Sequence, residues 1–555
     1  MNIELSLGDT ARVDNVNKRP TESAQSMQAR IAWALPRATG SDASIHSSAV
    51  SHWQTANRGV GCSGVSSETQ PTPREQQMHT EQAEPAGIEQ RTIAPVPSSE
   101  RHGRVRDLFT IWFGSNLMLL TIVTGVLATA VYGLPLWWAV VAIVLGNALG
   151  GISMALHSAQ GPRLGVPQMI QSRGQFGGFG ALVVVAVVLI MYVGFFASNL
   201  VLGGQSLHQL LPGASVDVGI LLSGVVSLAL CVFGYDLIHA VNRYATVIAG
   251  LVLAAALVAL LVNGLPAGTL SRGGFSASGF VATLALGALW QIAYAPYVSD
   301  YSRYLPEDTP AGSTFWATYA GCVLGSVLAM AFGALIGAAA PTADAAAAMH
   351  SLTGSIGWLV VLVLGVGICN ANAINLYGGV LSTVTVGQTF KSSWVPRGRT
   401  RVMLSAVFAL VSIVMAVAGK ANFLTNYTDF IFLLLYALIP WTAINLVDYY
   451  LIKRGHYDVG SFFRRNGGIY GKYNVVALTV YVIGILVEVP FFSTTLYTGP
   501  VAKSIGGADI SWIVGGLVVC PLYYWVARRF GTSAGAEVRP AQTAPSHARE
   551  LVEVA

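Results

Sequence analysis

A proline interrupts an apolar segment in the stretch Leu289-Trp-Gln-Ile-Ala-Tyr-Ala-Pro-Tyr-Val-Ser-Asp-Tyr-Ser-Arg-Tyr304. Pro296 has no amide hydrogen and its ring collides with the preceding helical turn, so we expect the helix to kink or unwind just before it. Gln291 and the neighbouring aromatic rings add hydrogen-bonding groups and flat surfaces at that break. The alternative is a plain proline kink at a helix end, with Asp300 and Arg303 as an ion pair.

The composition around this stretch is that of a membrane protein. Of 555 residues, 53% are hydrophobic and 10% are charged, whereas soluble domains have about 25% charged residues. Glycine follows no fixed period and apolar residues dominate, which excludes collagen-like and wholly disordered chains. The net charge of +5 gives no basis for nucleic-acid binding. The five cysteines show neither metal-binding spacing nor a disulfide framework.

Twelve apolar segments of membrane-spanning length predict an all-α membrane domain over residues 101–530. They run from Leu108 to Val131, Trp137 to Leu156, Phe179 to Leu207, Val218 to Phe233, Thr246 to Val262, Gly279 to Tyr297, Phe315 to Ala340, Ile356 to Gly387, Val402 to Ala418, Phe423 to Ile444, Val475 to Phe492 and Ile510 to Val526. They lack the alternating polarity of barrel strands. The polar stretches 1–100 and 531–555 are predicted to be a disordered leader and tail.

Positive charge is distributed unevenly between the two ends of these segments. Loops on one side carry nearly all the Lys and Arg, and the other side carries Arg272, Lys420 and Lys503. The positive-inside rule then places both termini in the cytoplasm. We expect a multi-pass protein of a bacterial-type inner membrane.

Two further segments carry polar residues at membrane depth. The first contains Gly114-Ser-Asn116, which weakens a helix and is tolerated where backbone lines a cavity. The eighth contains Asn370, Asn372 and Asn375, and the last two share a helix face because they are three residues apart. Two such amides can recognise the edge of a flat, uncharged ligand. Hydrogen bonds to a neighbouring helix are the alternative in both segments.

The first and sixth segments, both interrupted, lie five segments apart. A repeat of five helices would therefore be inverted relative to the next one. Interrupted helices at matching positions of two such halves surround a binding site near the middle of the membrane in many transporters. We expect a five-plus-five inverted repeat followed by two additional C-terminal helices.

Three long motifs follow one another along the chain. They are Pro167-Gln-Met-Ile-Gln-Ser-Arg-Gly-Gln-Phe-Gly177, Ala293-Tyr-Ala-Pro-Tyr-Val-Ser-Asp-Tyr-Ser-Arg-Tyr-Leu-Pro306, and residues 435–450 continuing through Arg454-Gly-His-Tyr-Asp458. They resemble the purine and cytosine permease branch of the nucleobase:cation symporter-1 family, whose members also include uracil, thiamine and allantoin permeases. The resemblance covers about Glu89 to Arg529.

The resemblance implies that a nucleobase-like substrate binds between the first, third, sixth and eighth helices. The base would lie on an aromatic ring of the third helix, Phe195 or Phe196, with Phe195 preferred. On the sixth helix, Trp290 and Gln291 are both candidates. Together with the amides described above, the predicted substrate-binding residues are Asn116, Phe195, Phe196, Trp290, Gln291, Asn372 and Asn375.

A cation is expected to drive uptake, and neither a cofactor nor a bound metal is expected. Sodium-dependent relatives carry hydroxyls on the eighth helix beside the substrate amides, whereas Leu364 to Ala371 contains none. Oxygen atoms near Gly114 and on Asn370 remain as possible sodium ligands. We therefore favour a proton, with Asp429 and Glu488 as candidate carriers, because ionisable residues at membrane depth are often functional. Both could instead lie at the membrane interface.

These observations favour a secondary active transporter that imports cytosine, a purine or a related heterocycle by cation-coupled alternating access. The alternative is a sodium-coupled or uncoupled permease for allantoin, hydantoin, uracil or a vitamin-like heterocycle. A membrane-embedded enzyme is disfavoured because no His lies near the middle of an apolar segment. A channel is disfavoured because no filter motif is present. The expected partners are a small nucleobase-like molecule and the lipid bilayer.

Overall fold

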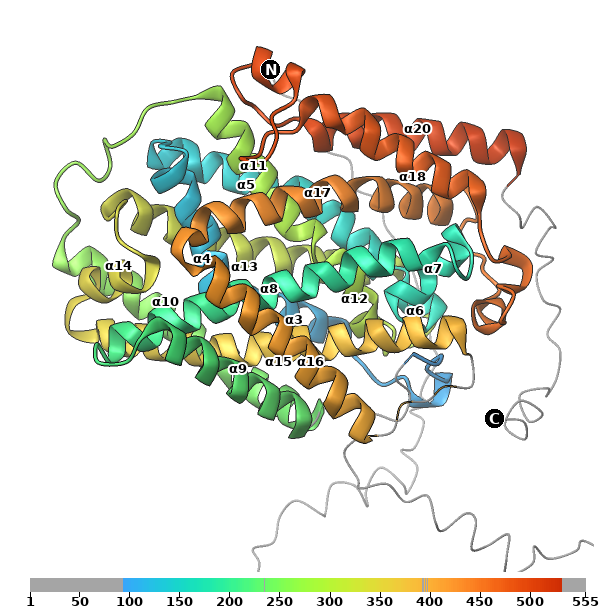
Figure 1. Cartoon of the computed structure of the whole chain (residues 1–555), viewed down its shortest axis with the longest axis horizontal. Helices are drawn as coiled ribbons and strands as arrows, with labels where there is room; N and C mark the ends of the chain where they lie inside the picture. The colour runs from blue at the N-terminus through green and yellow to red at the C-terminus, as the bar shows by residue number, and fades with distance from the viewer. Residues whose placement is uncertain (1–92, 234, 392–393, 395, 397, 532–555) are drawn as a thin grey trace, which may run out of the picture. The chain divides into compact units, whose positions relative to one another are not determined.

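The computed structural model describes residues 93–233, 235–391, 394, 396 and 398–531 (Figure 1). The described part of the chain is helical, and its one strand-like contact is an isolated bridge between Ser493 and Thr498. Of the predicted disordered leader and tail, 1–92 and 532–555 lie outside the described residues. Residues 93–100 are described. There Ile93 and Val96 are buried, and the Val96 amide donates to the Gly165 carbonyl over 2.9 Å.

Each apolar segment predicted above forms helix. The helices that correspond to these segments are α3 (Val105–Asn116), α4 (Leu119–Val126), α5 (Leu136–Ser158), α8 (Ala181–Leu210), α9 (Val216–Phe233), α10 (Tyr235–Asn263), α11 (Ala277–Ile292), α12 (Ala295–Ser302), α13 (Ala311–Ala339), α15 (Gly357–Phe390), α16 (Gly398–Gly419), α17 (Phe423–Val447), α18 (Val475–Glu488) and α20 (Ser511–Phe530). Four short helices were not predicted: α6 (Gly161–Leu164), α7 (Gln168–Phe176), α14 (Ala345–Leu352) and α19 (Pro500–Ser504).

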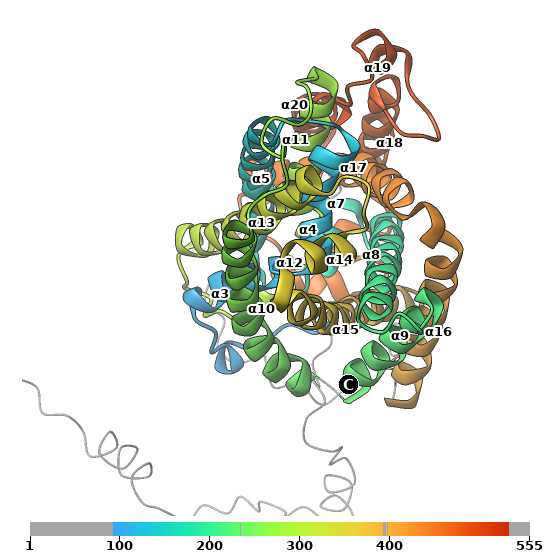
Figure 2. The same cartoon turned by 90° about the vertical axis from the view of Figure 1, so that its left-hand side faces the viewer.

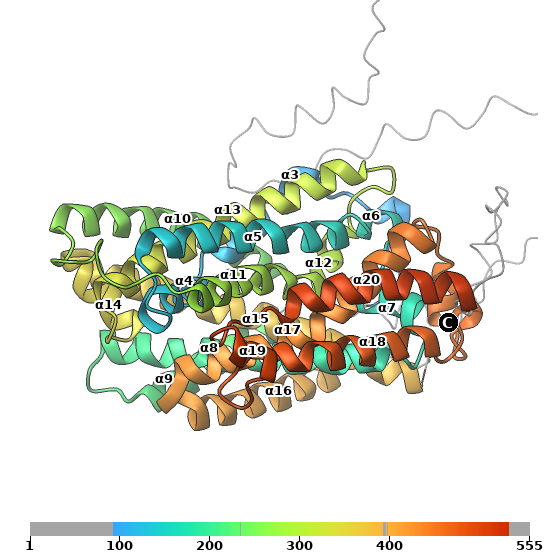
Figure 3. The same cartoon turned by 90° about the horizontal axis from the view of Figure 1, so that it is seen from above.

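Most of the long helices run side by side. α13 packs against α3, α4 and α5, while α5 also packs against α11 and α15 packs against α8. The last two helices, α18 and α20, pack against each other and against α17. Figure 3 shows α14 at one end of these helices and α6 and α7 at the other. Figure 2, viewed along most helix axes, shows α3 and α10 on one side of the bundle and α8, α9 and α16 on the other.

The first and sixth apolar segments are both interrupted where the sequence predicted. A bend of 59° separates α3 from α4, and at the bend the Leu117 amide donates to the Gly114 carbonyl over 3.0 Å. Two residues separate α11 from α12. Pro296 lies in the first turn of α12, where a helix needs no amide donor.

The structure contains helices long and apolar enough to cross a membrane several times. Seven meet both criteria in the described residues, or eight if the bent α3–α4 pair is one span. One of these runs, Gly398–Ile452, contains both α16 and α17. α9 and α18 are apolar but shorter. The chain is therefore a multi-pass membrane protein.

Glycines bring the backbones of α4 and α13 into direct contact. A Cβ atom on Gly333 would lie 1.8 Å from the carbonyl oxygen of Ile122, and one on Gly125 would lie 1.9 Å from that of Met330. Real Cβ contacts are never this short, so neither position accepts a side chain without movement of a helix. The two glycines thus hold the half-helix α4 against the continuous helix α13.

We expect Gly333→Ala to destabilise the protein by about 1 to 3 kcal/mol, the usual cost of overpacking a core. Gly516→Ala is the matched control because a Cβ atom there meets no atom within 4 Å. The melting temperatures of both variants in detergent test this prediction. Equal melting temperatures for the two variants would contradict the close contact of α4 and α13.

Candidate functional site

A cavity lies beside both helix breaks. It contains about 850 Å³ of space free of protein atoms, including its open mouth. Its walls come from α3, α4, α8, α10, α11, α12 and α15, together with the α3–α4 and α11–α12 connections. None of the described residues that line it is charged. Such a cavity suits an uncharged ligand.

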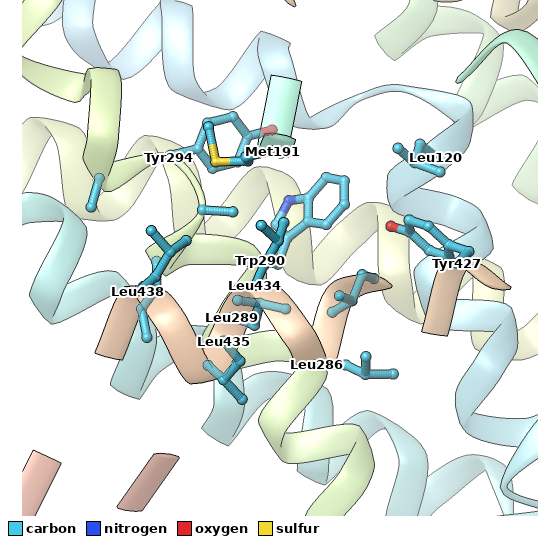
Figure 4. Close-up of a cluster of buried hydrophobic side chains, with 14 of the residues drawn as sticks. Leu120, Met191, Leu286, Leu289, Trp290, Tyr294, Tyr427, Leu434, Leu435 and Leu438 are labelled. Carbon is cyan, nitrogen blue, oxygen red and sulfur yellow. The ribbon is translucent and has the colours of Figure 1, made fainter. Parts of the chain in front are cut away.

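Aromatic rings form one wall of this cavity. The ring of Trp290 is nearly perpendicular to that of Phe195, with an interplanar angle of 79° and 6.1 Å between the ring centroids. It is also nearly perpendicular to the ring of Tyr294, with an angle of 80° and 6.0 Å between centroids. All three residues line the cavity. Figure 4 shows the Trp290 indole in a cluster with Tyr294, Met191 and leucines of α17. Edge-to-face packing of this kind stabilises the three rings relative to one another.

Asn116 is buried behind this wall and holds Trp290 in place. Its side-chain oxygen accepts hydrogen bonds from the Trp290 indole nitrogen over 2.6 Å and from the Ser326 hydroxyl over 2.8 Å. Its amide nitrogen donates to the Trp112 carbonyl over 2.6 Å. Asn116 does not line the cavity. Predicted as a substrate contact, it instead connects the end of α3 to the ring on α11.

The side chains of Trp290 and Gln291 point in different directions. Trp290 lines the cavity, whereas Gln291 points away and is fully buried. The Gln291 amide donates to the Asn147 side-chain oxygen on α5 over 2.8 Å and to the Ser326 hydroxyl on α13 over 2.9 Å. Successive residues on a helix point about 100° apart, so only one of these two can face the ligand.

The amides of α15 are divided between the cavity and the protein interior. Asn370 and Asn375 line the cavity, but Asn372 is fully buried and does not. The Asn372 oxygen accepts a hydrogen bond from Asn199 over 3.0 Å, and its nitrogen donates to the Phe196 carbonyl over 3.3 Å. Asn372 therefore occupies the interhelical position that the sequence left open as an alternative.

Phe196 also lies outside the cavity. It is fully buried, and its ring packs edge to face against Phe408 of α16, at 77° and 6.3 Å. Of the two aromatic candidates, Phe195 lines the cavity and Phe196 does not. The predicted site residues that line the cavity are Phe195, Trp290 and Asn375, with Gly114 and Asn370 from the ion-coupling set.

Asn199 and Trp112 are among the cavity-lining residues that were not predicted from the sequence. Asn199 on α8 is 1% exposed, and its side-chain oxygen has no hydrogen-bond partner among the described residues. Trp112 on α3 packs edge to face against Tyr294 at 5.5 Å and Tyr301 at 5.3 Å. Helical spacing could have identified both, because Asn199 follows Phe195 by four residues and Trp112 precedes Asn116 by four.

The four ion-coupling candidates fall into two groups. Gly114 and Asn370 line the cavity, but Asp429 and Glu488 do not. Asp429 accepts hydrogen bonds from the amide and the hydroxyl of Thr495. Glu488 is fully buried on α18, and neither carboxylate oxygen finds a hydrogen-bond partner in the described structure.

No group of His, Cys, Asp or Glu side chains in the described residues could hold a metal ion. The fold and cavity together define a multi-pass membrane transporter with an uncharged, partly aromatic cavity at two helix breaks. Residues 95–515 match the family described as permease for cytosine/purines, uracil, thiamine, allantoin. The chain belongs to this family, which confirms the resemblance to the nucleobase:cation symporter-1 family.

Individual relatives agree with this assignment. A putative purine-cytosine permease of Bacillus subtilis (strain 168), YxlA, is 42% identical, and the match covers 79% of this chain and 95% of that protein. The purine-cytosine permease fcyB of Emericella nidulans is 26% identical over 77% of this chain and 86% of its own. Both are named as permeases, so the protein is a transporter and not an enzyme.

A solved structure shares the fold. It is Mhp1, a nucleobase-cation-symport-1 family transporter, in a closed conformation with bromovinylhydantoin bound. Its TM-score is 0.63 at 18% sequence identity, and the match covers 80% of this chain and 96% of that one.

The arrangement of the wall predicts which positions a water-soluble thiol reagent can reach. After replacement of the five native cysteines, we expect Asn375→Cys to be modified and Gln291→Cys to be protected, because only Asn375 lines the cavity. Labelling rates of the purified variants provide the measurement. Equal rates at the two positions would contradict the orientation of α11 described here.

Proposed function

We propose that the protein imports cytosine, a purine or a closely related nucleobase, together with a cation, by alternating access. The observation that supports this most strongly is the combination in one uncharged cavity of aromatic faces with carboxamides. Stacking of a base on an aromatic ring contributes about 1 to 3 kcal/mol. Leaving a buried amide without its partner costs a similar amount, about 1 to 3 kcal/mol. The aromatic rings would therefore provide affinity, and the amides would provide selectivity.

The named relatives support the same class of substrate. The two permeases described above are both named for purine and cytosine. A hydantoin is the second candidate, because Mhp1 shares the fold and was solved with bromovinylhydantoin bound. Both ligands are flat, uncharged rings with hydrogen-bond donors and acceptors on their edges.

We infer that the amides of Asn199 and Asn375 face the edge of the substrate. The nitrogen of Asn199 is already bonded to Asn372, so the side-chain oxygen of Asn199 remains as an acceptor for a substrate N–H. This assignment gives Asn372 an indirect role, since its oxygen fixes the orientation of the Asn199 amide. Selectivity would then depend on Asn372 although that residue does not touch the substrate.

We further propose that the protein crosses the membrane twelve times, with α3–α4 and α11–α12 each forming one broken span. The five-plus-five inverted repeat would end at α17, and α18 and α20 would be the two additional spans. The distribution of Lys and Arg supports cytoplasmic termini and an inner membrane. The end of the helix bundle that contains α6 and α7 would then face the cytoplasm.

In this orientation the contact between Thr124 and Tyr427 would lie on the outer side of the cavity. The hydroxyls of Thr124 on α4 and Tyr427 on α17 are hydrogen-bonded over 2.8 Å, and both residues are buried. The helices that contribute most of the cavity-lining residues are α15, α3 and α10. Alternating access would require that the Thr124–Tyr427 contact separates when the cavity opens outwards.

We propose a proton in preference to sodium as the coupling cation. The part of α15 beside the cavity has no hydroxyl between Leu364 and Ala371, and sodium prefers several oxygen ligands. Glu488 supports a proton because an ionised carboxylate without any hydrogen-bond partner is very costly to bury. Asp429 is the second candidate carrier.

Asn199→Ala and Asn372→Ala are each expected to reduce saturable uptake of cytosine or purine about tenfold or more, while the protein still reaches the membrane. The double variant is expected to be no worse than the poorer single variant, because the two residues share one hydrogen bond and their effects are not additive. Initial uptake rates against substrate concentration, corrected for protein amount, test this.

Asn426→Ala serves as the control because this residue is exposed on α17. Undiminished uptake in Asn199→Ala or Asn372→Ala would refute the assigned roles. Effects that simply add in the double variant would show that Asn372 does not act through Asn199.

The coupling ion is tested in proteoliposomes. We expect an inward proton gradient to drive accumulation, an uncoupler to abolish it, and replacement of sodium by choline to have no effect. Glu488→Gln is expected to lose accumulation but to retain substrate exchange, because a carboxamide cannot carry the proton. A strict requirement for sodium would contradict proton coupling.

A further inference from the structure

A second hollow lies at the end of the bundle that contains α7, away from the substrate cavity. It encloses about 250 Å³, open to the surroundings, and is lined by α7, the segment between α7 and α8, the end of α15 and the segment after α17. Three arginines line it: Arg173, Arg464 and Arg465. No acidic residue does so among the described residues.

Arg173 is a buried part of this hollow. It is 6% exposed, and it donates hydrogen bonds to the Phe462 carbonyl over 2.8 Å and to the Thr389 hydroxyl over 2.9 Å. Its third nitrogen, Nε, is buried without a hydrogen-bond partner in the described part of the chain. Arg173 therefore connects α7 to α15 and to the loop that carries the other two arginines.

Arg464 and Arg465 are exposed at the rim. Neither side chain takes part in an ion pair or a hydrogen bond with any described residue. Guanidinium groups bind phosphate oxygens in paired, planar geometry. Two free guanidiniums beside a third, buried one make a site for a phosphate group.

The surroundings of the hollow indicate a membrane lipid. Phe179 lines the hollow, and its ring contacts Phe390 at 5.7 Å and Tyr473 at 6.0 Å. Phe390 is 61% exposed and Tyr473 is 56% exposed. Exposed aromatic rings beside basic residues are typical of the level of the lipid headgroups.

We propose that this hollow binds the phosphate of an anionic phospholipid headgroup, with Arg464 and Arg465 as its direct contacts. The acyl chains would lie along the exposed apolar face beside Phe390, and Arg173 would position the loop. Bound lipid would hold α7, α15 and the segment after α17 together. This inference does not depend on the identity of the transported substrate.

The test compares two double variants of the full-length protein in detergent, R464Q/R465Q and R528Q/R529Q. The second pair is the matched control because it is also exposed and lies at the end of α20, outside the hollow. Native mass spectrometry measures binding of phosphatidylglycerol and of phosphatidylcholine with the same acyl chains. Inorganic phosphate is added in a separate series.

We expect the wild-type protein and R528Q/R529Q to retain phosphatidylglycerol at least tenfold more strongly than phosphatidylcholine. R464Q/R465Q is expected to lose this preference while keeping its melting temperature without lipid. An unchanged preference in R464Q/R465Q, or an equal loss in both variants, would overturn the proposal. Displacement of the lipid by millimolar inorganic phosphate would also overturn it, because the hollow would then be a site for a free anion.

Discussion

Backbone polar groups inside a membrane must be hydrogen-bonded within the protein, and this constraint determines where the chain can be interrupted. The bend between α3 and α4 and the gap between α11 and α12 are tolerated because both lie beside a cavity. Neighbouring continuous helices support them. Glycines let the backbones of α4 and α13 touch, because a Cβ atom added to either glycine would lie only 1.8 to 1.9 Å from a carbonyl oxygen of the facing helix. The broken helix is therefore fixed against an unbroken one.

The same constraint explains why several polar side chains near the cavity do not face it. Each break requires donors and acceptors in the interior, and Asn116 and Gln291 supply them. Asn116 binds the indole of Trp290, while Gln291 connects α11 to α5 and α13. The cavity wall is thus made of aromatic rings and amides, and a buried layer of polar side chains holds them in place. This layer links the two broken helices to each other.

The apolar helices, the two breaks and the approximate position of the cavity could be predicted from the sequence, because hydropathy and proline have strong local effects. It was less informative about which side chains face the cavity. Adjacent candidates such as Trp290 and Gln291, or Phe195 and Phe196, differ only in rotation about a helix axis, and that rotation is set by tertiary packing. Asn199 was missed since a single Asn in an apolar helix resembles an ordinary interhelical contact.

The central claim is that a flat heterocycle binds in the cavity against the ring of Trp290. Equilibrium binding of radiolabelled cytosine and adenine to the purified protein tests it most directly, with Trp290→Ala compared with Trp316→Ala, whose ring is 64% exposed. We expect saturable binding in the wild-type protein and Trp316→Ala, and a loss of about tenfold or more in affinity in Trp290→Ala. Unchanged binding in Trp290→Ala would contradict it.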